Sequence, residues 1–402
     1  MSGITYSPDG GKSWIGPLSP EVFAQLKASG VILPEYPVRG DAGAEEYPAA
    51  AAPVPVGPDS FTWSHFISGV FTRHTQDEMV DFFCAGSSKT TPPLREVSAT
   101  WPGPWVFARV LVFLILLCAG LYWGLNTYNN PKFVPTIIMV GSMSVPLCVL
   151  LFVYEMNIRR DVPFYTVMKT FMLGGVLSML FTMVLHSHFP LLQAAYWAGP
   201  IEETAKLFAV LVVASSCRKN GILTGVLLGC AIGAGFAAFE TMGYVFEALL
   251  PLVEGRAAIG VLQHFGAPPH VIQYVAQNLE QYMQACDPDE VMFERGLLAP
   301  AAHVVWTAIT AGAFWMVMGE KVKQGLRSAH DTKIDFSILT DKRFLHIAWV
   351  PVVLHMVWNS GFFSSHGLLK FVGLGVVGWM LLLRLVQMGI NQVKDEKIKL
   401  GL

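Results

Sequence analysis

Long apolar segments are the feature that most constrains the fold of this chain. Between residues 105 and 389 we count eight of them, and each is long enough to cross the ~30 Å hydrocarbon core of a bilayer as a helix of about 20 residues. Backbone polar groups cannot remain unpaired in lipid, so such segments are expected to be helical. The segments are residues 105–127, 133–156, 163–187, 192–216, 222–249, 298–319, 344–363 and 367–389. The sequence therefore predicts an all-α polytopic membrane protein with an eight-helix transmembrane bundle.

The composition agrees with this class and excludes others. The chain is 53% hydrophobic and 14% charged, whereas soluble proteins carry about 25% charged residues. The net charge is −2, and no basic stripe with interleaved aromatic residues is present, so we expect no nucleic-acid partner. The six cysteines show neither CxxC nor paired spacing, which argues against a disulfide framework or a cysteine zinc site.

The distribution of Lys and Arg predicts the orientation of the bundle. Basic residues follow the second, fourth, sixth and eighth apolar segments: Arg159, Arg160, Arg218, Lys219, Lys321, Lys323, Arg327, Lys333, Lys342, Arg343, Lys394, Lys397 and Lys399. The loops between the other segments hold few, and the long loop expected at 250–297 is mainly acidic. Cytoplasmic loops are enriched in Lys and Arg. Both termini are therefore expected in the cytosol, and we see no cleavable signal peptide in the polar residues 1–60.

The residues outside the bundle divide into four parts. Residues 1–41 are expected to form a small cytosolic α+β module, with a short helix capped by Ser19 and started by Pro20. This stretch resembles the bacterial GYF-like module often attached to membrane proteins; the alternative is a poorly ordered tail. Residues 42–60 form an Ala/Pro linker, and residues 61–104 an amphipathic segment at the membrane surface, with a capping box at Thr75–Glu78. The transmembrane domain spans 105–390, and 391–402 is a basic cytosolic tail.

Three ionisable residues open the fourth apolar segment. Glu202, Glu203 and Lys206 follow Gly199-Pro200, and we expect Pro200 to start the helix. Lys206 lies about 40° from Glu202 and about 60° from Glu203 around a helix, so the three can share a face. An ionisable group in hydrocarbon costs at least ~2.5–3.5 kcal/mol and usually marks a function. The plainer alternative is a structural Glu202–Lys206 ion pair.

Other polar residues are expected at the same depth as these three. Given the predicted topology, Glu240 in the fifth segment, His303 early in the sixth, and His355 and Asn359 late in the seventh all fall in the outer half of the membrane. Their convergence predicts one shared site. Taken singly, each histidine could be a hydrogen-bonded core residue, and Asn359 could simply link two helices.

The fifth segment also contains a small-residue pattern. Gly225, Gly229 and Gly233 are spaced in the GxxxG manner and predict that this helix packs tightly against a neighbour.

Glutamates, histidines and an amide in a water-accessible cavity suit hydrolysis. A carboxylate can accept a proton from water, a histidine can share that task or bind a metal, and an amide can donate to an oxyanion. HExxH, GxSxG and GxGD-like patterns are absent. A proton-coupled membrane transporter that relays protons through the same glutamates is the alternative from another class. We see no repeat relating the first four segments to the last four, as transporters usually show.

Four short motifs together resemble those of a known family. They are EExxK at Glu202, Glu203 and Lys206, FAxxE at Phe236, Ala237 and Glu240, the histidine His303, and HxxxN at His355 and Asn359. In this order they resemble the PrsW family of intramembrane proteases over about residues 60–390. That family is distantly related to the CAAX prenyl protease/bacteriocin-processing family. This chain departs from those relatives, because it has Glu240 in place of a histidine and Lys206 one position before their arginine.

The resemblance implies an activity and roles for the site residues. It implies hydrolysis of a peptide bond in a membrane-anchored protein, such as an anti-sigma factor or a peptide precursor, in the bacterial cytoplasmic membrane. Glu202 or Glu203 would activate water, Glu240 and His303 would complete the site, and His355 and Asn359 would stabilise the oxyanion. Lys206 and Phe236 would support it.

A metal is compatible with the same residues. Zn²⁺ takes about four N, O or S ligands, and Glu203, Glu240, His303 and His355 are the candidate ligands. A metal-free water activated by glutamate would use the same side chains, so both mechanisms stay open. The expected partners are the substrate protein, the lipid bilayer and a cytosolic partner of residues 1–41.

Overall fold

The computed structural model divides the chain into two units, Met1–Val56 and Gly57–Leu402. The residues it describes are 4–6, 15–28, 38–39, 58–75, 78, 83–86, 90–189, 194–217, 219–298, 302–328, 333–361 and 367–402.

The described part of the N-terminal unit combines short strands with one helix. Strands β1 (Ile4–Tyr6), β2 (Ile15–Leu18) and β3 (Val38–Arg39) form an antiparallel sheet in the order β2-β1-β3. Helix α1 (Pro20–Ala28) begins at Pro20, and the Oγ of Ser19 accepts a hydrogen bond from the N–H of Val22 at 3.3 Å. The predicted cap is therefore present. The resemblance to a GYF-like module stays a prediction, and most of the Ala/Pro linker lies outside the described residues.

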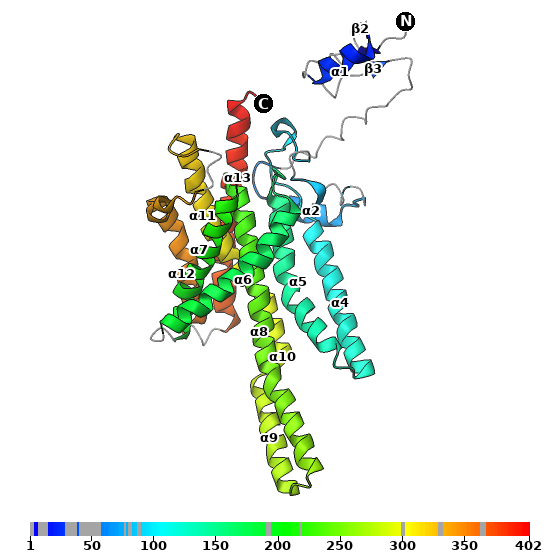
Figure 1. Cartoon of the computed structure of the whole chain (residues 1–402), viewed down its shortest axis with the longest axis vertical. Helices are drawn as coiled ribbons and strands as arrows, with labels where there is room; N and C mark the ends of the chain where they lie inside the picture. Colours follow the sequence, from blue (N-terminus) through cyan, green and yellow to red (C-terminus); the bar gives the residue numbers. More distant parts are fainter. Residues whose placement is uncertain are drawn as a thin grey trace. The chain divides into compact units, whose positions relative to one another are not determined.

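The second unit is helical in the residues that the structure describes (Figure 1). Its elements are α2 (Trp63–Phe71), η1 (Leu94–Glu96), α4 (Val106–Tyr128), α5 (Phe133–Met156), α6 (Phe164–His188), η2 (Ala195–Trp197), α7 (Ala198–Ser216), α8 (Ile222–His264), α9 (Pro269–Ala285), α10 (Pro288–Leu298), α11 (His303–Lys323), η4 (Phe336–Thr340), α12 (Lys342–Asn359) and α13 (Leu368–Lys399). Helix α2 was not expected. Glu78 and Thr75 exchange the two hydrogen bonds of the predicted capping box, at 3.0 and 3.2 Å.

Six helical segments of the described chain are long and apolar enough to cross a membrane. They are α4, α5, α6, α8, α13 and the segment that ends with α11. The predicted spans at 192–216 and 344–363 correspond to α7 and α12, which are not among the six. These two helices carry Glu202, Glu203, Lys206 and the basic pair Lys342-Arg343, and the charges lower their hydropathy. The count of eight spans therefore remains a prediction.

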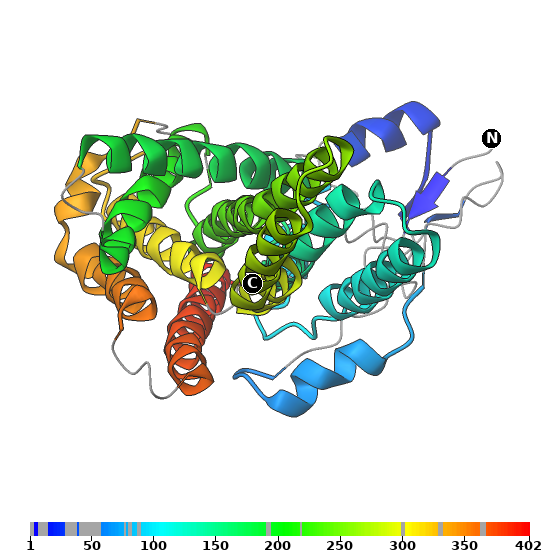
Figure 2. The ribbon, with the colours of Figure 1, turned by 90° about the horizontal axis from the view of Figure 1, so that it is seen from below.

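Helix α8 lies at the centre of the bundle. Viewed along the bundle, α5, α6 and α11 surround it (Figure 2), and its residues from Ile222 to Ala238 are buried throughout. A Cβ atom at Gly233 would overlap the backbone carbonyl oxygen of His303, so α8 and α11 approach closely only because this position is a glycine. The prediction that the GxxxG face packs tightly against a neighbour is confirmed, and the neighbour is α11.

The expectation of a loop over 250–297 is wrong. Helix α8 continues through Pro251 to His264, and α9 returns beside it before α10 begins. A 43-residue helix is about 65 Å long at 1.5 Å per residue, about twice the hydrocarbon thickness. The α8–α9 hairpin accordingly extends past the neighbouring helices (Figure 1). Its acidic residues gave it the composition of a loop, but contacts such as Leu279 against Gly255 pair the two helices.

The basic loops gather at one end of the bundle. Arg159, after α5, forms an ion pair with Glu396 of α13 at 2.5 Å. Lys397 donates to the backbone carbonyl oxygens of Arg95 and Val97, at 3.2 and 2.7 Å. Helix α13 continues to Lys399, so most of the predicted tail at 391–402 is helical and these contacts hold its last turns; its cytosolic location stays a prediction.

A buried carboxylate joins α5 to α4 at this same end. Glu155 accepts hydrogen bonds from the backbone N–H groups of Trp105, Val106 and Phe107 at 2.7, 3.0 and 3.0 Å. The first N–H groups of a helix have no partner within the helix. Glu155 therefore supplies the acceptor that the first turn of α4 needs.

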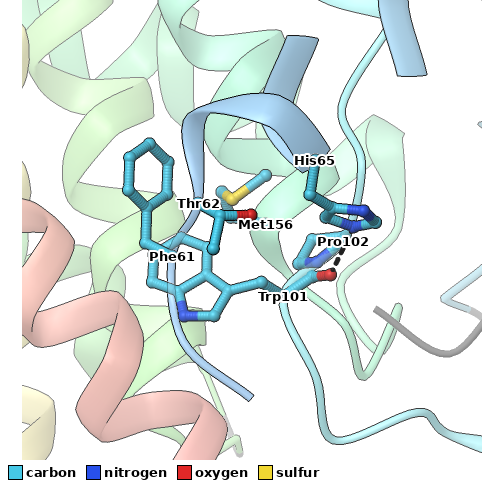
Figure 3. A pocket seen from close by; sticks show the side chains of 6 residues that line it. All are labelled: Phe61, Thr62, His65, Trp101, Pro102 and Met156. Atoms are coloured by element: carbon cyan, nitrogen blue, oxygen red, sulfur yellow. Dashed lines mark hydrogen bonds between the residues drawn. The ribbon is translucent and has the colours of Figure 1, made fainter. Parts of the chain in front are cut away.

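A small pocket lies beside this junction (Figure 3). It is lined by Phe61, Thr62, His65, Trp101, Pro102 and Met156, and the His65 ring nitrogen Nε2 lies 3.0 Å from the carbonyl oxygen of Trp101. The pocket contains no cluster of catalytic side chains. The contact between His65 and Trp101 holds α2 against the segment that leads into α4.

Candidate active site

The first turns of α7 are held against α12. Helix α7 begins at Ala198 rather than at Pro200, so the predicted start is off by two residues. A Cβ atom at Gly199 would lie 2.8 Å from Cγ of Met356 and 3.0 Å from the carbonyl oxygen of Val352, so the glycine allows this close contact. It brings Glu202 and Glu203 beside the histidine that precedes Met356. Both glutamates and Lys206 are buried.

Lys206 lies among the acceptors of the site. Its Nζ donates to Glu203 Oε1 at 2.8 Å, to Glu202 Oε2 at 3.5 Å and to His303 Nδ1 at 2.8 Å. The ammonium also lies 4.3 Å from the ring centroid of Phe236. A lysine ammonium has no acceptor, so His303 Nδ1 must accept this hydrogen bond, and the ring proton of neutral His303 is on Nε2.

Each histidine is oriented by a carboxylate. His355 Nδ1 lies 2.9 Å from Glu203 Oε1, and His303 Nε2 lies 3.2 Å from Glu240 Oε2. Since an ionised carboxylate only accepts, these two ring nitrogens carry the protons. The other ring nitrogens, His355 Nε2 and His303 Nδ1, both lie 3.8 Å from Glu202 Oε2.

Glu202 Oε2, His303 Nδ1 and His355 Nε2 form a set that could hold a metal ion, although Lys206 donates hydrogen bonds to the first two of these atoms. Glu202, His303 and His355 offer one ligand atom each within 4.8 Å of one another. Two imidazoles and one carboxylate are a common protein ligand set for catalytic zinc, which keeps its fourth position for water. Histidine ligands usually donate their other N–H to a carboxylate; His355 does so to Glu203, and Glu240 lies within ion-pair distance of His303 Nε2. The donor chemistry therefore fits a divalent metal. Of the ligands expected from the sequence, His303 and His355 belong to this group, and the carboxylate grouped with them is that of Glu202.

Arg295 is a site residue that the sequence analysis missed. Its Nη2 lies 2.7 Å from Glu240 Oε2, and its guanidinium carbon lies 3.8 Å from the ring centroid of Tyr244. From the sequence it counted only as a charge in the expected loop. The available signal was its position eight residues before His303, at the entrance to the next apolar segment.

An aromatic wall closes the site on one side. The ring of Trp306 is fully buried and lies 5.5 Å from His303, 4.8 Å from His355 and 5.7 Å from Trp358, centroid to centroid. Trp306 also escaped the sequence analysis, because an aromatic residue in an apolar helix carries no signal of its own. The wall excludes water from one side of the histidines.

Asn359 is the one predicted site residue outside this network of contacts. It is the last residue of α12, one turn after His355, and is half-buried. Its side chain makes no hydrogen bond with any residue that the structure describes. The amide is therefore free to bind a group from outside.

The site groups three carboxylates with two cations. Glu202, Glu203 and Glu240 face Lys206 and Arg295 through contacts of 2.7 to 3.5 Å. Breaking one partner of a buried pair leaves an uncompensated charge, which is strongly destabilising. A bundle made only for stability would rarely contain such a cluster, whereas buried ionisable groups in a membrane usually serve a function.

The fold is that of a polytopic membrane protein, a helical bundle with apolar segments long enough to span a bilayer, and its buried glutamate–histidine centre suits hydrolysis and could hold a metal ion. Comparison with family models then identifies the family: residues 162–386, more than half of the chain, match the PrsW family of intramembrane metalloproteases. The chain belongs to this family, and it is an intramembrane protease. The matched range contains all of the site residues described above.

The other comparisons add no relative. No curated protein and no solved structure matches the chain. The family match does not reach residues 1–41, so the GYF-like module stays a prediction, as does the distant relationship to CAAX prenyl proteases.

Proposed function

We propose that this protease cleaves a peptide bond of a membrane-anchored protein and uses one divalent metal ion, Zn²⁺, held by Glu202, His303 and His355. The observation that carries the proposal is the position of Glu202 Oε2, 3.8 Å from both His303 Nδ1 and His355 Nε2. Zinc held by these residues would act as a Lewis acid, lowering the pKa of water to about 7 and polarising the peptide carbonyl. The roles below are those of this chain's own side chains.

Glu203 and Glu240 act differently from Glu202. Glu203 holds the His355 tautomer through Oε1, and its Oε2 has no hydrogen bond from the described residues, so Glu203 is the base that takes a proton from water. Glu240 orients His303. This assigns metal binding to Glu202 and proton transfer to Glu203, a division that the sequence left open.

Asn359 and Lys206 complete the proposed roles. The free amide of Asn359 stabilises the oxyanion of the tetrahedral intermediate. Removing such a donor typically lowers kcat by a factor of about 10²–10³. Lys206 compensates the charge of Glu203, which it contacts at 2.8 Å.

The substrate class follows from the burial of the site. A peptide bond must enter the bundle to reach these side chains, and a substrate anchored in the same membrane is held where it can do so, such as a single-span anti-sigma factor or a peptide precursor. The distribution of Lys and Arg supports a topology with both termini in the cytosol of a bacterial cell and the site towards the outer leaflet. The N-terminal module then meets a cytosolic partner. Proton-coupled transport is disfavoured, because the family match is to proteases.

The test is a cleavage assay with the full chain in proteoliposomes, using a panel of single-span membrane proteins. We expect the unaltered chain to cleave at least one, and Glu202→Gln, His303→Ala and His355→Ala to lose both cleavage and bound zinc, measured by elemental analysis. Glu254→Gln is the matched control, since Glu254 lies exposed on the α8–α9 hairpin. Proton-driven uptake without cleavage would overturn the proposal, as would full activity of the three site variants.

A further inference from the structure

Arg295 reaches the site from a helix that lies outside the four motif-bearing segments. Its guanidinium is held by two residues of α8 that are one turn apart. Glu240 Oε2 lies 2.7 Å from Nη2, and the Tyr244 ring lies under the guanidinium at 3.8 Å. A planar guanidinium suits both contacts, because it pairs with carboxylates and stacks on aromatic faces.

The oxygen that Arg295 contacts is also the one that faces His303. Glu240 Oε2 lies between the guanidinium and His303 Nε2, which is 3.2 Å away. The opposite ring nitrogen, Nδ1, accepts from Lys206. The orientation of the His303 ring therefore depends on where the Glu240 carboxylate is held, and Arg295 is the cation that contacts the same carboxylate oxygen.

Helix α10 places Arg295 through contacts of its own. The hydroxyl of Tyr122, on α4, donates to Asp289 Oδ1 at 2.7 Å. Met292 packs in a small cluster with Ile137 of α5 and Val245 of α8. Because α4, α5 and α8 fix this helix, Arg295 approaches Glu240 from a rigid support.

We propose that Arg295 is a positioning residue: it holds the Glu240 carboxylate where that group orients His303 for metal binding and catalysis. The inference rests on the proposed function, since it needs the Glu240–His303 pair to matter. Arg295 contacts neither His303 Nδ1, His355 Nε2 nor Glu202 among the described contacts, so it acts through Glu240. Its removal should lower kcat and leave KM unchanged, and the loss should depend on Glu240.

The experiment is a double-mutant cycle of Arg295→Met and Glu240→Gln. It uses the full chain in proteoliposomes and a single-span test protein that the unaltered chain cleaves. Removing a residue that orients a metal ligand typically lowers metal affinity or activity 10–100-fold. We therefore expect Arg295→Met to lower kcat about tenfold. On the Glu240→Gln background the further loss should be less than about twofold, because the two residues act as a unit. Arg295→Lys should retain part of the activity. Arg256→Met, an exposed arginine on the hairpin, is the matched control.

Three results would overturn the inference. Equal losses from Arg295→Met on both backgrounds would show that it acts independently of Glu240. A raised KM with unchanged kcat would make it a substrate contact. Lower thermal stability with unchanged kcat per folded molecule would make it purely structural. If the Glu240→Gln variant cleaves normally but the His303→Ala variant does not, the role assigned to Glu240 and Arg295 is wrong and the proposed function stands. If both variants cleave normally, the proposed function is wrong as well.

Discussion

Glu203 on α7 and His355 on α12 are 152 residues apart in sequence, yet Glu203 Oε1 lies 2.9 Å from His355 Nδ1. The close approach of α7 and α12 at Gly199 makes this contact possible. It fixes the proton of His355 on Nδ1 and turns Nε2 towards Glu202. The arrangement of the whole site follows from this pair and from the equivalent pair of Glu240 with His303.

Glu203→Gln tests the first pair. Glutamine keeps the size of the side chain, but it removes the charge that favours the Nδ1 proton and the base that we assign to water. We expect cleavage to fall by at least 100-fold and zinc affinity to fall about 10–100-fold, the usual cost of losing a partner of a metal ligand. Metal titration of purified protein measures the second effect, and Glu254→Gln serves as the control. Unchanged affinity together with lost cleavage would leave Glu203 as a base only.

Lys206→Met tests whether the ammonium and a metal compete. In the structure Lys206 uses the His303 Nδ1 lone pair that a metal would need. Removing the ammonium frees that nitrogen and leaves Glu203 uncompensated, and both changes favour a divalent cation. We expect zinc to bind about tenfold more tightly or better, although the variant should be less stable. Competition with a chromophoric chelator measures the affinity, and weaker binding would show that Lys206 supports the metal site.

Gly233→Ala tests the close packing of α8 and α11. A methyl group there meets the carbonyl oxygen of His303, which is backbone and cannot rotate away. Overpacking of this kind typically costs about 1–3 kcal/mol, and it should also displace His303 and lower cleavage. Gly243→Ala is the control on the same helix, because a Cβ atom there meets nothing within 4 Å. Equal thermal stability of the two variants would contradict the packing account.

Glu155→Ala tests the junction of α4 with α5. Three backbone N–H groups lose their acceptor, and leaving a buried donor unsatisfied costs about 1–3 kcal/mol each. We expect a marked loss of thermal stability. Cleavage per folded molecule should not change, since Glu155 lies at the end with the basic loops. A variant as stable as the unaltered chain would mean that water replaces the carboxylate.

The sequence indicated the site better than it indicated the surrounding scaffold. Glu202, Glu203, Lys206, Glu240, His303 and His355 were predicted to meet because loop charges gave the depth of each segment. Helical spacing was enough to predict the shared face of α7.

Residues that reach the site through tertiary contacts were not predictable in this way. Arg295 was hidden because α9 and α10 have the polar composition of a loop, and their helical pairing depends on contacts such as Leu279 with Gly255. The proposal that Glu202 is a metal ligand depends on which nitrogen of each ring faces its carboxylate, and that is given only by distances between helices far apart in sequence.

X-ray absorption at the zinc edge of the purified, zinc-loaded chain tests the central claim most directly. With Glu202, His303 and His355 as ligands, the spectrum should show only nitrogen and oxygen neighbours at about 2.0–2.2 Å, with outer-shell scattering from two imidazoles. In the His303→Ala variant, any zinc that remains bound should show outer-shell scattering from one imidazole instead of two. No imidazole scattering, or sulfur neighbours at about 2.3 Å, would contradict the proposed metal site.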